Sequence, residues 1–240
     1  MPLTGTLINV ATVLVGTAVG ILFGARLPDR VRETLLHALG LLTLVVGIRE
    51  ALGAFEPPLS ALTRGSVLVV MGSVLLGGLV GEAARIEDRL ERAGKALERR
   101  LGGSQARFTE GFVTASLVFC VGPMTILGSI QGGLAGDHQL LAIKALLDGF
   151  AAVAFASALG WGVGFSVITI LVYQGGLALG AASLADVFTP VTIAAITAVG
   201  GVLILGIGLR LLELRRIRVG NLLPALVLGP LAFALLEALG

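Results

Sequence analysis

The sequence predicts an all-α membrane protein that crosses the bilayer several times. Hydrophobic residues make up 56% of its 240 residues and charged residues only 13%, and the mean hydropathy is +1.00. A soluble domain carries about 25% charged residues, so this chain lacks the polar surface that a water-facing shell requires. Its 35 glycines are typical of helices that approach one another closely in lipid. We predict a single transmembrane domain over residues 1–240.

Eight apolar runs are long enough to span a membrane. A helix needs about 20 mostly apolar residues to cross a hydrocarbon core of about 30 Å. Two prolines, Pro224 and Pro230, interrupt the last run. The eight predicted spans are Thr6–Ala25, Thr34–Leu52, Ser66–Ala83, Gly111–Ile130, Gln139–Leu159, Gly162–Ala182, Pro190–Leu209 and Asn221–Leu239.

The basic residues orient these spans. Lysine and arginine near span ends favour the cytoplasmic side. Fourteen of the 17 cations fall in the first, third and seventh loops, whereas only Arg49 and Arg64 fall on the opposite side and Lys144 lies inside a span. We therefore predict that both termini lie outside the cytoplasm. Because the basic residues flank apolar runs, they indicate contact with membrane lipids and no nucleic-acid partner.

The long third loop has a helical pattern of its own. An apolar residue recurs every three or four positions, at Ile86, Leu90, Ala93, Leu97 and Leu101, and the positions between are rich in charge. This spacing predicts an amphipathic helix over residues 85–107. It is expected to lie on the cytoplasmic interface with its arginines near anionic headgroups. The alternative is a helix that docks a partner protein.

The two sides of this loop resemble each other. The stretch 20–24 followed by Asp29 parallels the stretch 128–132 followed by Asp137, at an offset of 108 residues. This predicts two three-span repeats, residues 5–84 and 111–181, followed by a C-terminal helix pair at 190–240. An odd number of spans inverts the second repeat, an architecture common in secondary transporters. Glycine and leucine are so abundant here that short matches also arise by chance.

The fourth span has a helix breaker at its centre. Pro123 follows Gly122, and proline offers no N–H to the carbonyl four residues back, that of Phe119. In lipid a freed backbone group needs a partner from protein or from water in a cavity. The break is either a structural kink or a place where backbone carbonyls meet a substrate or ion. Polar side chains that can assist are Ser116, Thr125, Ser129 and Gln131.

The fifth span carries two charged residues, Lys144 and Asp148. Four residues apart, they share one helix face and can pair. Charged groups inside a membrane are costly and indicate a functional site by default. An ammonium, unlike a guanidinium, can lose its proton when buried. The pair is therefore either a static tie or a switch in which Asp148 exchanges Lys144 for a proton or an ion.

Further polar groups lie in the sixth and first spans. Tyr173, Gln174 and Gly175 sit near the centre of the sixth span, where Gly175 and the next glycine weaken the helix. Asn9 is a weaker candidate of the same type in the first span. A helix–helix contact is the simpler interpretation of each. With one cysteine and two dispersed histidines, the sequence predicts no metal site and no cofactor.

The run from Gly111 to Gln131, together with Lys144, the stretch 147–150 and the stretch 173–175, resembles the YqgA/YdfK family of bacterial inner-membrane proteins, domain of unknown function 554. The resemblance covers essentially the whole chain. It implies a multi-pass protein of the bacterial cytoplasmic membrane and supplies no activity.

Three functions follow as hypotheses. The first is an ion- or proton-coupled transporter or permease for a small solute or ion, with a midplane site between broken helices. The second is a membrane scaffold or sensor that acts through residues 85–107. The third, an enzyme acting on lipid, lacks a catalytic cluster, and P-loop, GxSxG and HExxH motifs are absent, so we predict no enzyme. We also expect that so small an eight-helix chain can form a homodimer.

Overall fold

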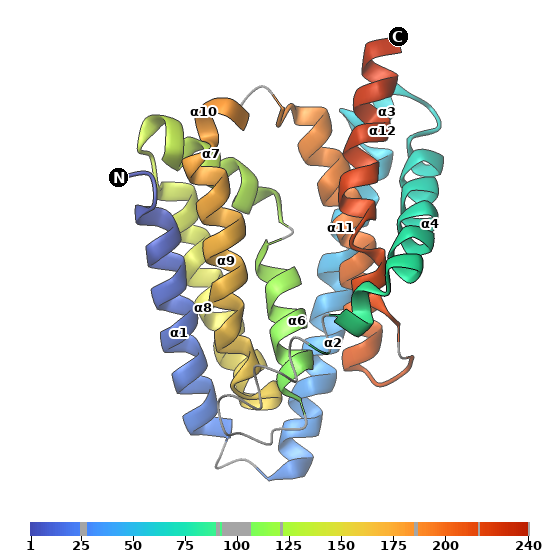
Figure 1. Cartoon of the computed structure of the whole chain (residues 1–240). Coiled ribbons are helices and arrows are strands. Elements are labelled where there is room, and N and C mark those ends of the chain that lie inside the picture. Colours follow the sequence, from blue (N-terminus) through green and yellow to red (C-terminus); the bar gives the residue numbers. More distant parts are fainter. Residues whose placement is uncertain are drawn as a thin grey trace. The chain divides into compact units, whose positions relative to one another are not determined.

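The computed structural model describes residues 1–24, 28–89, 92, 107–120, 122–184, 187–215 and 217–239. Over these residues the chain is almost entirely helical and contains no strand (Figure 1). The long helices are α1 (Thr4–Gly24), α2 (Asp29–Leu52), α4 (Ser66–Ala84), α6 (Phe108–Cys120), α7 (Pro123–Ala135), α8 (Gln139–Leu159), α9 (Gly162–Leu179), α11 (Pro190–Leu211) and α12 (Ala225–Leu239). The short ones are η1 (Gly53–Phe55), α3 (Leu59–Leu62), α10 (Ala181–Leu184) and η2 (Val219–Leu222).

The helices confirm the predicted fold class. Among the described residues, seven helical segments are long and apolar enough to span a membrane. The bent pair of α6 and α7 makes an eighth when it is counted as one span. Large apolar side chains on these helices are exposed, for example Leu22 and Phe23 on α1. Such a surface suits lipid and not water, so the chain is a membrane protein.

The predicted cytoplasmic helix at 85–107 lies for the most part outside the described residues. At its start, α4 ends at Ala84, and Arg85 adopts a left-handed conformation with φ of 51°. A left-handed residue is a common helix terminus because it turns the chain out of the helical path. Residues 86–89 are helical again.

The helices form two compact units. Unit 1 comprises Met1–Leu39 and Glu91–Asp186, and unit 2 comprises Gly40–Leu90 and Val187–Gly240. These units divide the chain differently from the predicted repeats, because α1 packs with α8 and α9 instead of with α4. The inverted repeat itself stays a prediction.

Unit 1 is built around the contact between α1 and α8 (Figure 1). The two helices run in parallel, and glycines on α1 permit a very close approach. A Cβ added at Gly20 would meet the Val153 carbonyl oxygen and would lie 2.9 Å from the Ala156 Cβ. Only a residue without a side chain fits there. Helix α9 packs against both α1 and α8, so the three helices contact one another.

Unit 2 joins the second half of α2 to α4, α11, η2 and α12. A buried carboxylate ties its ends together. Glu87 accepts hydrogen bonds from the backbone N–H of Gly220 at 2.6 Å and from Arg210 Nη1 at 3.0 Å. The Glu87 backbone N–H donates to Asn221 Oδ1 at 2.8 Å. These bonds fix the turn between α11 and α12 against the chain that follows α4.

Candidate functional site

Polar side chains from three membrane-spanning helices meet inside unit 1. Helix α1 contributes Thr6 and Asn9, α8 contributes Lys144 and Asp148, and α9 contributes Gln174. We call these five residues the polar cluster. All five are buried: Thr6, Asn9 and Gln174 have no exposed surface, and Lys144 and Asp148 are 5% and 8% exposed.

Asp148 is the centre of the polar cluster. Its Oδ2 atom accepts a hydrogen bond from Lys144 Nζ, one helical turn earlier on α8. The same oxygen accepts a second hydrogen bond from Asn9 Nδ2 at 2.9 Å. A buried carboxylate requires such partners because its removal from water costs on the order of several kcal/mol. The ammonium compensates its charge and the amide adds a donor.

Asn9 links the charged pair to α9. Its Nδ2 atom also donates to Gln174 Oε1 at 3.0 Å, and Gln174 Nε2 donates to Thr6 Oγ1 at 3.4 Å. Both N–H groups of Asn9 are thus in use. Its Oδ1 atom is buried and has no hydrogen-bond partner among the described residues. A buried amide oxygen without a donor costs about 1–3 kcal/mol, so the polar cluster has an unsatisfied acceptor at its core.

The predicted break in the fourth span lies in the same unit. Helix α6 ends at Cys120 and α7 begins at Pro123, and the two helices are bent by 61°. Gly122 is extended, with ψ of 151°. The carbonyl freed by the proline finds a partner: Thr125 Oγ1 donates to the Phe119 carbonyl at 3.1 Å. The expected compensation by a nearby hydroxyl is therefore confirmed for Thr125.

The end of α6 lies close to the charged pair. Cys120, the last residue of α6, is buried, and α6 packs against α8, the helix that carries the pair. One helical turn before Cys120, Ser116 Oγ and Thr169 Oγ1 share a hydrogen bond of 2.9 Å that fixes α6 to α9. The broken helix thus ends beside the polar cluster, and α9 holds it there.

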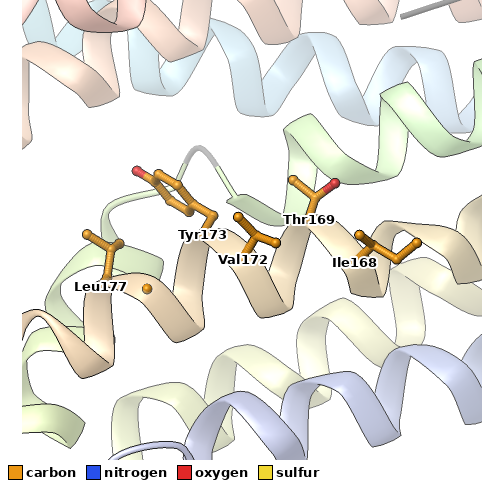
Figure 2. A pocket seen from close by; sticks show the side chains of 6 residues that line it. Ile168, Thr169, Val172, Tyr173 and Leu177 are labelled. Atoms are coloured by element: carbon orange, nitrogen blue, oxygen red, sulfur yellow. The ribbon is translucent and has the colours of Figure 1, made fainter. Parts of the chain in front are cut away.

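An open pocket lies on a different face of α9. Its lining comes from the stretch 168–177 and is apolar except for Thr169 and Tyr173. Figure 2 shows the Tyr173 ring directed away from the axis of α9 on this face. Gln174, the next residue, points instead into the polar cluster. The pocket and the polar cluster therefore lie on different faces of α9.

The structure brings some of the predicted residues together and separates others. Lys144, Asp148, Asn9 and Gln174 meet in the polar cluster, whereas Tyr173 does not join it. Ser116 lies one helical turn before the end of α6 and bonds to α9. Gln131 is exposed on α7.

The sixth span, where a glycine pair is expected to weaken the helix, forms the continuous helix α9 from Gly162 to Leu179. Gly175 packs against Leu3 and Thr6 of α1. The fourth span is broken because Pro123 lacks a backbone donor, whereas the glycine pair of the sixth span retains its backbone N–H groups.

Thr6 was not predicted as a site residue. It is the fifth member of the polar cluster and accepts from Gln174. A signal for it existed, because Thr6 lies three residues before Asn9 and shares its face of the first span. Among the described residues, no three His, Cys, Asp or Glu side chains gather to hold a metal ion.

Comparison with known proteins places the whole chain in one sequence family. Residues 4–234 match DUF554, described as a protein of unknown function. The uncharacterised membrane protein YdfK of Bacillus subtilis (strain 168) is 29% identical over 236 residues, covering 98% of each chain. The uncharacterised protein YqgA of Escherichia coli (strain K12) is 33% identical over 236 residues, covering 96% of each. No solved structure matches the chain.

Proposed function

The chain belongs to the DUF554 family of proteins of unknown function, and we propose that it is an ion- or proton-coupled transporter or permease for a small solute or ion. The observation that supports this function is the polar cluster, a charged pair buried among three membrane-spanning helices and centred on Asp148. Ionisable groups inside a membrane protein commonly mark the path of an ion or a substrate.

The surroundings of the pair favour a functional site over a purely structural ion pair. A structural ion pair needs hydrogen-bond partners for every polar group around it, because an unpartnered buried polar group weakens the fold. Here Asn9 Oδ1 has no hydrogen-bond donor within the part of the chain that the structure describes. The helix that ends beside the pair is also broken, at the junction of α6 and α7, and broken helices line the midplane sites of many transporters. In this proposal Asp148 is the coupling carboxylate and Lys144 is its partner in the empty state.

A ligand screen tests this proposal. Purified protein in detergent is heated with a panel of inorganic ions, amino acids and small organic acids. A ligand that binds only the folded state stabilises it by RT ln(1 + [L]/Kd), about 2.7 kcal/mol at a hundredfold excess over Kd. The comparison protein is the double variant Lys144→Gln/Asp148→Asn, which removes both charges together and so leaves no lone buried charge.

We expect at least one compound to raise the melting temperature of the wild type and not that of the double variant. The same compound should then move into wild-type proteoliposomes. A panel that shifts neither protein, or shifts both equally, contradicts a ligand site at Asp148 and favours the scaffold function. Equal elution of the two proteins in size-exclusion chromatography is the folding control.

We also propose that the protein resides in the bacterial cytoplasmic membrane with both termini outside. The excess of arginine in the first, third and seventh loops supports this orientation. Reporter fusions test it. Alkaline phosphatase should be active when fused after Leu239 and inactive when fused within the third loop, and the reverse pattern contradicts the orientation.

A further inference from the structure

The polar cluster offers oxygen atoms to a positively charged ligand. They are the Asp148 carboxylate, the amide oxygens of Asn9 and Gln174, and the Thr6 hydroxyl. The unsatisfied atom of the polar cluster, Asn9 Oδ1, is an acceptor that lacks a donor. Carboxylate, amide and hydroxyl oxygens are the ligands that hard cations prefer. The site therefore suits a cation or a hydrogen-bond donor and does not suit an anion.

The charge of the polar cluster favours a cation with a single positive charge. Asp148 is its single carboxylate, and Lys144 balances it. Divalent ions such as Mg²⁺ and Ca²⁺ are usually held by more than one carboxylate or retain several waters. A monovalent cation on Asp148 gives the same net charge as the present ion pair, provided that Lys144 gives up its own charge.

We propose that the polar cluster binds a small hard monovalent cation, of which Na⁺ is the test ion, in exchange for the proton of Lys144. This inference rests on the proposed function and specifies its coupling chemistry. The Asn9 amide turns over, so that the cation contacts its oxygen together with the Asp148 carboxylate. The Lys144 ammonium leaves Asp148, breaks one Nζ–H bond and releases that proton to water. One positive charge enters the polar cluster as one leaves.

The groups that face the pair permit this exchange. From α1 and α9 the neighbours are the amides of Asn9 and Gln174, which do not titrate and which can present either a donor or an acceptor. From α6 the titratable group is the buried thiol of Cys120. No second carboxylate faces Lys144 among the described residues. Charge balance at the site therefore falls to Lys144 and Asp148 alone.

The test is cation-driven proton movement in proteoliposomes that contain the full chain and a trapped pH-sensitive dye. External NaCl is added at constant pH, with KCl, MgCl₂ and choline chloride in parallel. Wild-type protein should raise the internal pH on addition of NaCl, because each Na⁺ that enters expels one proton. Choline chloride should give no change. A response to MgCl₂ but not to NaCl would overturn the monovalent assignment.

The decisive variant is Lys144→Arg, which keeps a buried cation beside Asp148 but cannot release a proton. We expect its Na⁺-driven pH change to fall to that of liposomes without protein. Asn9→Ala removes the unsatisfied oxygen and should raise the half-saturating Na⁺ concentration about tenfold or more, by the loss of one charged contact. Thr12→Val is the matched control, because Thr12 lies on the same helix and its hydroxyl bonds only back to the Asn9 carbonyl.

The outcomes separate this inference from the proposed function. Full Na⁺-driven exchange in Lys144→Arg overturns the role of Lys144 and leaves transport standing. A solute that is driven by a proton gradient, with no response to Na⁺, overturns the cation site alone. If Lys144→Arg fails to fold, unchanged Na⁺ affinity in Asn9→Ala still overturns the cation site. Wild-type protein that moves neither ions nor solutes contradicts the proposed function itself.

Discussion

Removing one member of the Lys144–Asp148 pair should destabilise the protein far more than removing both. The side chains of Lys144 and Asp148 are only 7% and 11% exposed in unit 1, and each compensates the charge of the other. Breaking a buried ion pair from one side costs about 3–5 kcal/mol, whereas replacing both partners is often near neutral. We therefore expect Asp148→Asn and Lys144→Met each to lower the free energy of unfolding by about 3–5 kcal/mol. The double variant Lys144→Met/Asp148→Asn should lower it by only about 0–1 kcal/mol.

The pH dependence of the two single variants should have opposite signs. A lone buried ammonium in Asp148→Asn escapes its desolvation cost by releasing a proton, so the unfolded state binds one proton more than the folded state. Stability then rises with pH, by up to about 1.4 kcal/mol per unit. A lone carboxylate in Lys144→Met takes up a proton on folding, so its stability rises as the pH falls.

The assay is reversible unfolding in mixed micelles, followed by circular dichroism between pH 6 and 9. The double-mutant cycle gives the coupling energy directly. Additive effects of the two substitutions, or single variants that each cost less than about 1 kcal/mol, would refute the view that Lys144 and Asp148 form a charged pair in the resting protein.

Three further predictions use the same unfolding assay. Thr125→Val should cost about 1–3 kcal/mol because it leaves the carbonyl before the helix break without a donor, and Thr125→Ser should restore most of the loss; equal stability of the Val variant would contradict this role. Gly20→Ala should cost about 1–3 kcal/mol by pushing α1 off the α8 backbone, whereas Gly72→Ala, where nothing lies within 4 Å, should change stability by less than about 1 kcal/mol; similar effects at both sites would argue against the close approach. Glu87→Gln should lower the free energy of unfolding by about 1–3 kcal/mol, because it weakens the bond to Arg210. It should also expose the turn after α11 to added protease. Unchanged cleavage would show that the carboxylate does not hold that turn.

The features that sequence patterns predicted well are those decided within one segment. Apolar length sets the spans, so the helical membrane fold follows from hydropathy alone. The missing N–H of Pro123 sets the break between α6 and α7, and the hydroxyl two residues later is within reach of the freed carbonyl. The four-residue spacing of Lys144 and Asp148 sets their shared face and their contact.

The features that were missed depend on how separate helices pack. Tyr173 and Gln174 are neighbours in sequence, yet a rotation of about 100° per residue sends one to the open pocket and the other to the polar cluster. Taken alone, Asn9 is a weak candidate because a single amide does not show which way its helix face is turned. The spacing of Asn9 from Gly16 and Gly20, seven and eleven residues on, places it on the packed face of α1. This shared face with Gly16 and Gly20 is the sequence signal that marks Asn9 as a buried residue.

The grouping of helices into units was also beyond the sequence pattern. The predicted internal repeat groups α1 with the two spans that follow it, whereas the glycines of α1 fit the backbone of α8, 133 positions later. Shape complementarity between two helix surfaces decides this contact, and periodicity carries no information on which helix is the partner.

The measurement that tests the account most directly is flux into proteoliposomes that contain either the wild type or Lys144→Gln/Asp148→Asn. The compound used is the one that most stabilises the wild type in the ligand screen. We predict concentrative uptake by the wild type and none by the double variant, at matched protein content and orientation. Equal uptake by both proteins would contradict the claim that the buried pair of Lys144 and Asp148 is the transport site.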